Sequence, residues 1–280
     1  MTSARVAARR RHWAALVVGS VLLLVLSGCS LDDVPNQIAI PDPASDTGDR
    51  IFHLWQGTWV ALWIIGLFTW VLMLGAAYWF RRRRDDEVPK QTRYNLPIEV
   101  LYTITPLIVV LAFAWPTIRD GQIITEIKDD QAVTVNVVGY QWNWGFNYIE
   151  EDVYSVGSPA DPPVLYLPVD EKAQFVLTSP DVIHSFWIPD FLMKMDVVPG
   201  RANTFELTPT VEDRFTGKCA ELCGTYHSQM LFWVEVVDRE TFDAKMEELR
   251  AAGQEGTLDT DRSNTDADDL GIVRFGGDTS

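Results

Sequence analysis

Thirty consecutive residues without Asp, Glu, Lys or Arg, Ile51 to Phe80, limit the possible folds of this chain more than any other feature. A bilayer span needs about 20 predominantly apolar residues, so the run is long enough for one span and an interfacial turn. Tryptophan and tyrosine side chains gather near its two ends, as they do at membrane interfaces. Four consecutive arginines, Arg81 to Arg84, follow directly and predict that this end is cytoplasmic.

A second uncharged run, Val100 to Ile118, predicts a second span, since membrane helices tolerate prolines such as Pro106 and Pro116. We therefore predict a transmembrane hairpin over residues 51–118, with spans at about 58–80 and 98–118. Both outer ends of the hairpin would lie on the export side, which gives a two-pass protein with both termini outside. The lipoprotein-type signal at the start of the chain indicates that the membrane is a bacterial plasma membrane. The alternative is a helical hairpin inside a soluble protein, and the arginine run argues against it.

Residues 1–28 have the three-part layout of a secretory signal peptide, with basic residues, an apolar run and then small residues. The sequence Leu26-Ser27-Gly28-Cys29 resembles a bacterial lipoprotein processing site, at which Cys29 would become the acylated first residue. Residues 29–50 are rich in proline and aspartate and predict a tether. The alternative is an uncleaved signal anchor with an incidental cysteine.

The chain is acidic, with 39 acidic and 23 basic residues. Removal of residues 1–28 would remove four arginines and no acid, and would change the formal charge from −16 to −20. This charge argues against a nucleic-acid partner, because phosphate backbones are bound mainly by lysine and arginine. It favours a cationic soluble partner, whose encounter rate an acidic surface raises at low salt.

Beyond Arg119 the hydrophobic period changes to two, which predicts short strands of an all-β sandwich or barrel. A helix over about Thr241–Ala252, ended by Gly253, closes a predicted domain of residues 119–253. Residues 254–280 contain few large apolar side chains and predict a disordered acidic tail. The clearest strand patterns are residues 132–138, 174–178, 203–207 and 231–236.

Four soft or borderline metal donors lie within twelve residues, in the pattern Cys219-x3-Cys223-x3-His227-x2-Met230. Thiolates and thioethers select copper or similarly soft ions, whereas imidazole suits several metals. The predicted exported domain contains only one further histidine, His184, in a strand-like apolar segment. A β-sandwich can bring such a strand end to the same pole as the loop, which preorganises a metal site.

Other uses of these residues are open. A disulfide between Cys219 and Cys223 suits an oxidising compartment, but it leaves both histidines and Met230 without a role. A structural Cys2His2 zinc site leaves Met230 unused. A mononuclear blue-copper site uses only one cysteine. Two thiolates can instead bridge two copper ions that each bind one imidazole, an arrangement suited to electron relay rather than substrate chemistry.

The loop closely resembles that of subunit II of the haem-copper cytochrome c oxidases, as do the segments Asp181–Phe186 and Tyr140–Trp144. The resemblance extends from about Trp59 to Met246 and implies a membrane-anchored all-β protein, with a cupredoxin-like Greek-key β-sandwich behind the two-helix hairpin. Its partners would be catalytic subunit I, other oxidase subunits, the lipid bilayer, and cytochrome c or a membrane-bound c-type cytochrome. Electrons would enter at a binuclear copper centre and pass to haem in the catalytic subunit, where oxygen is reduced to water and protons are translocated.

The resemblance also implies the ligands of the copper pair. Cys219 and Cys223 would be the bridging thiolates, His184 and His227 the terminal imidazoles, and Met230 an axial ligand. A sixth residue, Glu221, would bind the second copper through its carbonyl and a magnesium ion, shared with the catalytic subunit, through its carboxylate.

Three more residues match functional positions of the family. Trp142 would accept the electron from the donor; strand alternation places it on one face with Tyr140 and Trp144, so a core position is the alternative. Glu99 matches the acid at the mouth of a proton-conducting pathway, and the alternative is a solvated helix end. Asp181 matches an acid that docks the donor.

Two other function classes remain open. One is the structural subunit II of a quinol oxidase, which would be expected to lack the two cysteines. The other is a membrane-tethered copper carrier, which needs an exchangeable metal and therefore a site with little burial.

Overall fold

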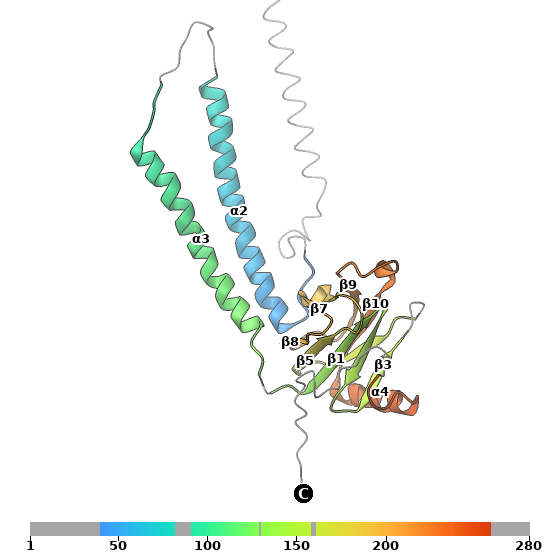
Figure 1. Cartoon of the computed structure of the whole chain (residues 1–280). Coiled ribbons are helices and arrows are strands. Elements are labelled where there is room, and N and C mark those ends of the chain that lie inside the picture. Colours follow the sequence, from blue (N-terminus) through green and yellow to red (C-terminus); the bar gives the residue numbers. More distant parts are fainter. Residues whose placement is uncertain (1–39, 82–90, 129, 158–160, 259–280) are drawn as a thin grey trace, which may run out of the picture. The chain divides into compact units, whose positions relative to one another are not determined.

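The computed structural model of the chain describes residues 40–81, 91–128, 130–157 and 161–258. Two long helices, α2 (Asp46–Trp79) and α3 (Leu96–Ile124), precede a β-rich domain that ends in helix α4 (Arg239–Ala251) (Figure 1). The predicted signal peptide, Cys29 and most of the tether lie outside the described residues, as do residues 259–280.

Helices α2 and α3 are long and apolar enough to cross a membrane, and no residue of their apolar windows is buried within the described structure. This exposure argues against a hairpin in the core of a soluble protein. The Ser45 side chain caps α2 by accepting the N–H of Gly48, and α3 begins with a proline in its first turn, where a missing N–H costs nothing. Pro106 and Pro116 both lie inside α3, as predicted.

Both helices extend beyond the predicted spans. Helix α2 begins at Asp46, within the predicted tether, because Ser45 supplies the cap there. Helix α3 continues past Ile118 to Ile124, inside the predicted β-domain, since residues 119–124 contain no helix-breaking proline.

Backbone hydrogen bonds join the start of α2 to the β-domain. The N–H of Ala44 donates to the Asp190 carbonyl at 2.8 Å, and the N–H of Asp46 donates to the Thr208 carbonyl at 3.1 Å. The hydroxyl of Ser45 donates to the Phe191 carbonyl at 3.0 Å while it caps the helix. The first turn of α2 therefore lies on the same side of the membrane as the β-domain.

The β-domain is a sandwich of two five-stranded sheets. The first sheet has the order β3-β2-β1-β5-β8 and the second has the order β4-β10-β9-β6-β7. Strands β1 and β5 are parallel, as are β10 and β4, and every other pair in these sheets is antiparallel. The strands of the first sheet are β1 (Val133–Tyr140), β2 (Asn143–Tyr148), β3 (Val153–Val156), β5 (Ala173–Thr178) and β8 (Asn203–Leu207). Those of the second are β4 (Val164–Pro168), β6 (His184–Ile188), β7 (Met193–Val197), β9 (Arg214–Cys219) and β10 (Leu231–Val237).

Aromatic rings from both sheets fill the core directly behind the candidate site. Phe186 and Phe232 stack at 4.9 Å between ring centroids with only 7° between planes, and Trp144 contacts both rings edge-on. Each such pair adds about 0.5–1.5 kcal/mol to the apolar area that it buries. This cluster gives the strand ends above it a rigid base.

The predicted fold class is confirmed, with two apolar helices followed by a β-sandwich. The four strand patterns of the sequence correspond to β1, β5, β8 and β10. The other strands were less visible. Edge strand β7, for example, carries Lys194 and Asp196 on its exposed face, and outward charges on an edge weaken the apolar alternation.

The expectation that Tyr140, Trp142 and Trp144 share one strand face is wrong. Strand β1 ends at Tyr140 and β2 begins at Asn143, so Gln141 and Trp142 form the turn between two antiparallel strands. Alternation holds only along an uninterrupted strand. Trp144 is fully buried in the core, whereas Trp142 is half-buried at the turn.

The C-terminal segment also departs from the prediction. Asp238 caps α4 by accepting the N–H of Thr241, so the helix begins at Arg239 rather than at Thr241. Residues 254–258, assigned to the disordered tail, lie along β3 and β2. The Gln254 carbonyl accepts the N–H of Tyr154, and the N–H of Leu258 donates to the Asn147 side chain. Hydrogen bonds to an edge strand fix the position of residues 254–258, and amino-acid composition alone does not reveal such bonds.

Candidate metal centre

Two neighbouring strands of the second sheet bring the first donors together. His184 is the first residue of β6 and Cys219 is the last residue of β9, and these strands pair with Phe186 opposite Cys219. The N–H of Ala220 donates to the Ser185 carbonyl at 2.9 Å and extends this register by one step. Residues far apart in sequence therefore meet at one end of the sheet.

The remaining donors come from the loop between β9 and β10. A short 3-10 helix, His227–Gln229, turns the chain so that Met230 faces back, and the N–H of Cys219 donates to the Met230 carbonyl at 3.1 Å. Gly224 has φ +125°, and a Cβ there would lie 3.1 Å from the Trp142 ring. This position therefore requires glycine for both backbone conformation and space.

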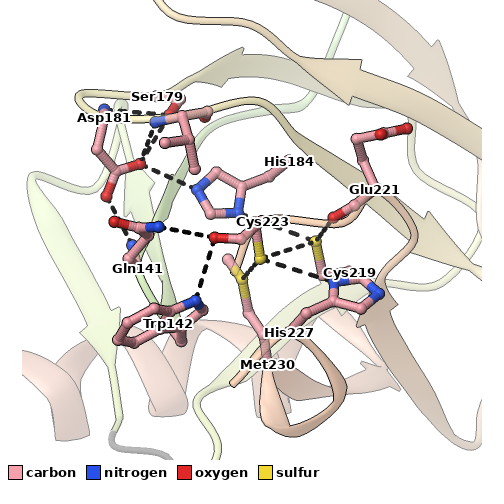
Figure 2. Close-up of polar contacts among 11 residues, drawn as sticks. Gln141, Trp142, Ser179, Asp181, His184, Cys219, Glu221, Cys223, His227 and Met230 are labelled. Atoms are coloured by element: carbon pink, nitrogen blue, oxygen red, sulfur yellow. Dashed lines mark hydrogen bonds and ion pairs between the residues drawn. The ribbon is translucent and has the colours of Figure 1, made fainter. Parts of the chain in front are cut away.

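The donors form one cluster around two sulfur atoms (Figure 2). The Sγ atoms of Cys219 and Cys223 lie 3.9 Å apart. His184 Nδ1 lies 3.9 Å from Cys219 Sγ, and His227 Nδ1 lies 3.6 Å from Cys223 Sγ. The Met230 Sδ lies 3.8 Å from Cys223 Sγ. Each sulfur therefore has one imidazole beside it, and the five residues predicted from the sequence are brought together.

Glu221 presents its two oxygen-bearing groups differently. Its carbonyl oxygen lies 3.2 Å from Cys219 Sγ and so belongs to the cluster, whereas the residue itself is exposed. Its carboxylate points away from the sulfurs (Figure 2). The backbone and side chain of Glu221 can therefore serve two separate sites.

Most of the cluster is shielded from water. His184 is fully buried, and Cys219, Cys223 and Met230 are at most 6% exposed, whereas His227 is half-buried. Burial of this kind holds a metal tightly and excludes competing ligands.

The two thiols differ sharply in acidity. Burial raises the pKa of Cys219, but hydrogen bonding to His184 and to nearby backbone groups lowers it to about 6. Burial, together with the charge of the Cys219 thiolate, raises the pKa of Cys223 to about 12. One sulfur is therefore ionised near neutral pH, and a cation between them is needed before both become thiolates.

Asp181 lies against the far side of the His184 ring. Its Oδ1 is 3.0 Å from His184 Nε2, and its side chain is only 9% exposed. Its Oδ2 accepts the N–H of Gln141 at 2.7 Å, and Oδ1 accepts the N–H of Val182 at 2.6 Å. The carboxylate thus fixes the imidazole with Nδ1 toward the sulfurs.

The charges of this pair follow from its contacts. Burial alone would raise the pKa of Asp181, but the N–H of Gln141 and the His184 ring lower it overall. Burial would lower the pKa of His184, and its contacts with Cys219 and Asp181 outweigh burial and raise it. An ionised carboxylate behind a ligand imidazole is the usual means of fixing its orientation and raising its basicity.

Trp142 lies at the surface side of the cluster. Its indole N–H donates to the Cys223 carbonyl at 3.2 Å, and the Gln141 side-chain amide donates to the same oxygen at 2.7 Å. The Tyr226 ring contacts the Trp142 ring edge-on at 5.0 Å and is 48% exposed. Sequence reasoning found Trp142 but missed Gln141 and Tyr226, whose only signal was their position next to matched residues.

The donor set is selective. A sulfur separation of 3.9 Å is far from the roughly 2.05 Å of a disulfide bond. The thioether of Met230 lies among the donors, which a Cys2His2 zinc site does not require. Two sulfurs, two imidazoles, a thioether and a carbonyl match the preferences of copper better than those of harder ions.

Glu99 lies far from this cluster along the chain, in the first turn of α3. Its Oε1 accepts the N–H of Asn95 at 2.8 Å, so the carboxylate satisfies one free donor of the helix start. The structure thus gives Glu99 a local role at the helix end that the sequence alone did not show.

Models of two domains of one protein family match the chain. The cytochrome c oxidase subunit II transmembrane domain matches residues 33–119, and the cytochrome c oxidase subunit II periplasmic domain matches residues 159–237. The first match contains α2 and all of α3 except residues 120–124, and the second contains every donor of the cluster.

Whole-chain relatives agree with these matches. A probable cytochrome c oxidase subunit 2 of Streptomyces avermitilis is 43% identical over 89% of each chain. Cytochrome c oxidase subunit 2 of Corynebacterium glutamicum is 32% identical over 72% of this chain and 73% of that one. Among solved structures, the periplasmic domain of cytochrome oxidase subunit II from Bradyrhizobium japonicum is 26% identical, with a TM-score of 0.42 over 45% of this chain and 99% of that domain.

Proposed function

This chain belongs to the cytochrome c oxidase subunit II family, and from this membership we propose that its β-sandwich accepts electrons from a c-type cytochrome at a copper pair. The electrons then pass to haem in the catalytic subunit, which reduces oxygen to water and translocates protons. One observation carries the proposal above all others. Two sulfurs lie 3.9 Å apart, and a separate imidazole stands beside each of them.

The donor set fits a copper pair. Cys219 and Cys223 would bridge the two ions, His184 and His227 would each bind one, and Met230, whose Sδ lies 3.8 Å from Cys223 Sγ, would contribute a thioether ligand. When bound, the pair supplies reversible one-electron exchange. The cluster is held by the ends of β6 and β9 and by the loop between β9 and β10. Its side chains therefore need to move little when the copper pair gains or loses an electron, which keeps the barrier to electron transfer low.

Glu221 would complete the site on the side of Cys219 through its carbonyl oxygen, which already lies 3.2 Å from that sulfur. Its exposed carboxylate is free to bind a magnesium ion at the boundary with the catalytic subunit, since Mg²⁺ prefers oxygen ligands. We propose this second role because the carboxylate points away from the sulfurs (Figure 2).

Trp142 is proposed as the residue that receives the electron. Its ring is half-buried at a turn, and its N–H reaches the Cys223 carbonyl. An electron on the ring can therefore reach a copper ligand through one hydrogen bond and the covalent bonds of Cys223.

Asp181 was matched to a residue that docks the donor. With its side chain 9% exposed and bonded to His184, a role in holding that imidazole is better supported by its contacts than a docking role. Glu99 is proposed at the mouth of a proton pathway, at the opposite end of the hairpin from the β-domain.

The chain is membrane-anchored and two-pass. We propose that both termini lie outside the cytoplasm. The arginine run after α2 marks the connection between the helices as cytoplasmic. The first turn of α2 is hydrogen-bonded to the β-sandwich, so the start of α2 and the sandwich both lie on the extracytoplasmic side. The lipid-modified Cys29 is proposed on that side too.

Spectroscopy of the full-length protein loaded with copper tests this function. We expect two copper ions per chain and a seven-line hyperfine pattern in electron-spin resonance, because one unpaired electron is shared by both ions. Rapid reduction by a soluble cytochrome c in stopped-flow experiments should follow. A four-line spectrum with one copper per chain would contradict the proposal.

The two other function classes are less well supported. A structural subunit of a quinol oxidase does not need the cysteine pair that this chain keeps in one buried cluster. A copper carrier needs exchangeable metal, and four of the donors here, His184, Cys219, Cys223 and Met230, are at most 6% exposed. Retention of copper during prolonged dialysis against a chelator separates a carrier from an electron-transfer site.

A further inference from the structure

A pocket of about 920 Å³ lies between α2 and α3 at the end where both helices meet the β-domain. Its volume is within the range of about 300–1,000 Å³ typical of ligand sites. No function proposed above uses it. Its lining changes in character along the helices, from charged residues near Asp49 to apolar ones near Phe113.

The charged end contains Arg50, a cation without an acidic partner among the described residues. Arg119 is paired with Asp120 at 2.8 Å, and His53 lies 3.5 Å from Asp49. Arg50 also lines the pocket, and it forms no ion pair with any of the described residues. A guanidinium without an ion-pair partner is suited to bind a phosphate, with which it can form two parallel hydrogen bonds.

The same end also offers a carboxylate for a cation. Asp49 is 61% exposed, and its only ion-pair partner among the described residues is His53, which lies one helical turn away. Asp49 and Arg50 thus offer opposite charges next to each other on the pocket rim. A ligand that carries both a phosphate and an ammonium group satisfies both.

The other end of the pocket is apolar. It is lined by Leu54 and Gly57 of α2 and by Ala112, Phe113 and Pro116 of α3. Gly57 has no neighbouring atom within 4 Å of the position that a Cβ would take, so this wall is open. These residues lie next to the apolar part of each helix, where acyl chains are the surrounding solvent.

We propose that this pocket binds one zwitterionic phospholipid, with its phosphate at Arg50, its ammonium at Asp49 and an acyl chain between α2 and α3. The amphipathic lining matches such a lipid along its length, from headgroup to chain. A transmembrane helix of another subunit would instead leave the charges of Arg50 and Asp49 against an apolar surface, which is unfavourable because buried charges need a partner.

Native mass spectrometry of the delipidated oxidase complex, titrated with dioleoylphosphatidylethanolamine, tests the proposal. We expect one tightly retained lipid per complex that Arg50→Gln removes, whereas Arg93→Gln, on the other side of the hairpin, retains it. Asp49→Asn should abolish the preference for phosphatidylethanolamine over phosphatidylglycerol. Gly57→Leu should exclude the lipid by filling the apolar wall, without removing any charge.

Three results would overturn the proposal. One is equal lipid retention by the wild type, Arg50→Gln and Gly57→Leu. Another is competition by glycerophosphoethanolamine or inorganic phosphate at concentrations similar to the lipid, which would show a soluble-anion site without an acyl chain. The third is loss of the catalytic subunit from Arg50→Gln, which would assign the surface to a protein partner. Circular dichroism reports in each case that the variant is folded, so failure of the copper proposal leaves the lipid measurement unaffected.

Discussion

The indole N–H of Trp142 donates a hydrogen bond to the carbonyl oxygen of Cys223 at 3.2 Å. This bond links a ring at a turn of the first sheet to a donor residue in the loop between β9 and β10 of the second sheet. The Gln141 amide donates to the same oxygen at 2.7 Å and fixes its direction. Neighbouring residues of one turn therefore hold the ring against the candidate metal centre.

Replacement of Trp142 should separate electron transfer from folding. Trp142→Gln removes the ring, and we expect the rate of reduction by cytochrome c to fall by orders of magnitude while copper content is retained. Trp142→Phe keeps a smaller ring without the N–H, so its rate should lie between the two. Trp233→Gln is the matched control, because Trp233 is half-buried beneath Arg214 and away from the donors. Stopped-flow reduction measures all four proteins, and a near-normal rate for Trp142→Gln would return Trp142 to a packing role.

Cys223→Ser should abolish the copper pair and leave membrane insertion intact. A hydroxyl is too hard and too weakly acidic to bridge two copper ions. Cys223 Sγ lies within 4 Å of the Cys219, His227 and Met230 donors, so no other side chain can substitute for it. Metal analysis and near-infrared spectra of the purified protein provide the measurement, with Ser228→Ala in the same loop as the control. Two coppers and an unchanged spectrum in Cys223→Ser would rule out the bridging role.

Asp181→Ala should loosen His184 as well as destabilise the sandwich. The substitution leaves the N–H groups of Gln141 and Val182 without their acceptor, and we expect a loss of about 3 kcal/mol in the free energy of unfolding. Copper should also be lost faster to a chelator, because His184 is no longer held. Asp196→Ala, an exposed acid on β7, should change neither property. If Asp181→Ala altered only the salt dependence of cytochrome binding, the docking role would be correct.

Copper binding should depend on pH with a defined sign. Because the pKa of Cys223 is raised to about 12, binding near neutral pH must displace its proton, and the apparent affinity should increase by about tenfold per pH unit. Below the pKa of about 6 of Cys219, a second proton is displaced and the dependence becomes steeper. The raised pKa of His184 acts in the same direction, since its protonated ring cannot bind. Titration in weak buffer measures the number of protons released when copper binds at each pH. A copper affinity that does not change with pH would contradict thiolate ligation.

Glu99→Gln should slow steady-state turnover without slowing electron transfer from cytochrome to copper. The glutamine amide oxygen can still accept the Asn95 N–H, so the start of α3 is preserved while the ionisable group is lost. Glu99→Ala removes both and serves as the comparison for helix stability. Turnover of both variants across a range of pH decides the role. Normal turnover in Glu99→Gln would leave only the helix-capping function.

Local patterns were sufficient to predict the membrane hairpin and the donor set. An uncharged run of thirty residues has few solutions other than a bilayer span, and four donors within twelve residues are close together in any fold. The sandwich class followed from the change to a period of two, and the loop resemblance identified His184 as the distant partner. None of these inferences needed knowledge of which strands pair.

Tertiary structure decided the features that depend on register between distant segments. The pairing of β6 with β9 brings His184 to Cys219 across 35 residues, and it turns Asp181 inward behind the ring. The turn at Gln141 and Trp142 interrupts the strand alternation, so only the structure shows Trp142 at the metal centre and Trp144 in the core. The pocket between α2 and α3 likewise depends on the packing of two helices, which brings the start of α2 near Asp49 beside the end of α3 near Arg119. Sequence periodicity reports which face of an element is apolar, whereas contacts between elements are set by hydrogen-bond register and side-chain packing, which no short window of sequence contains.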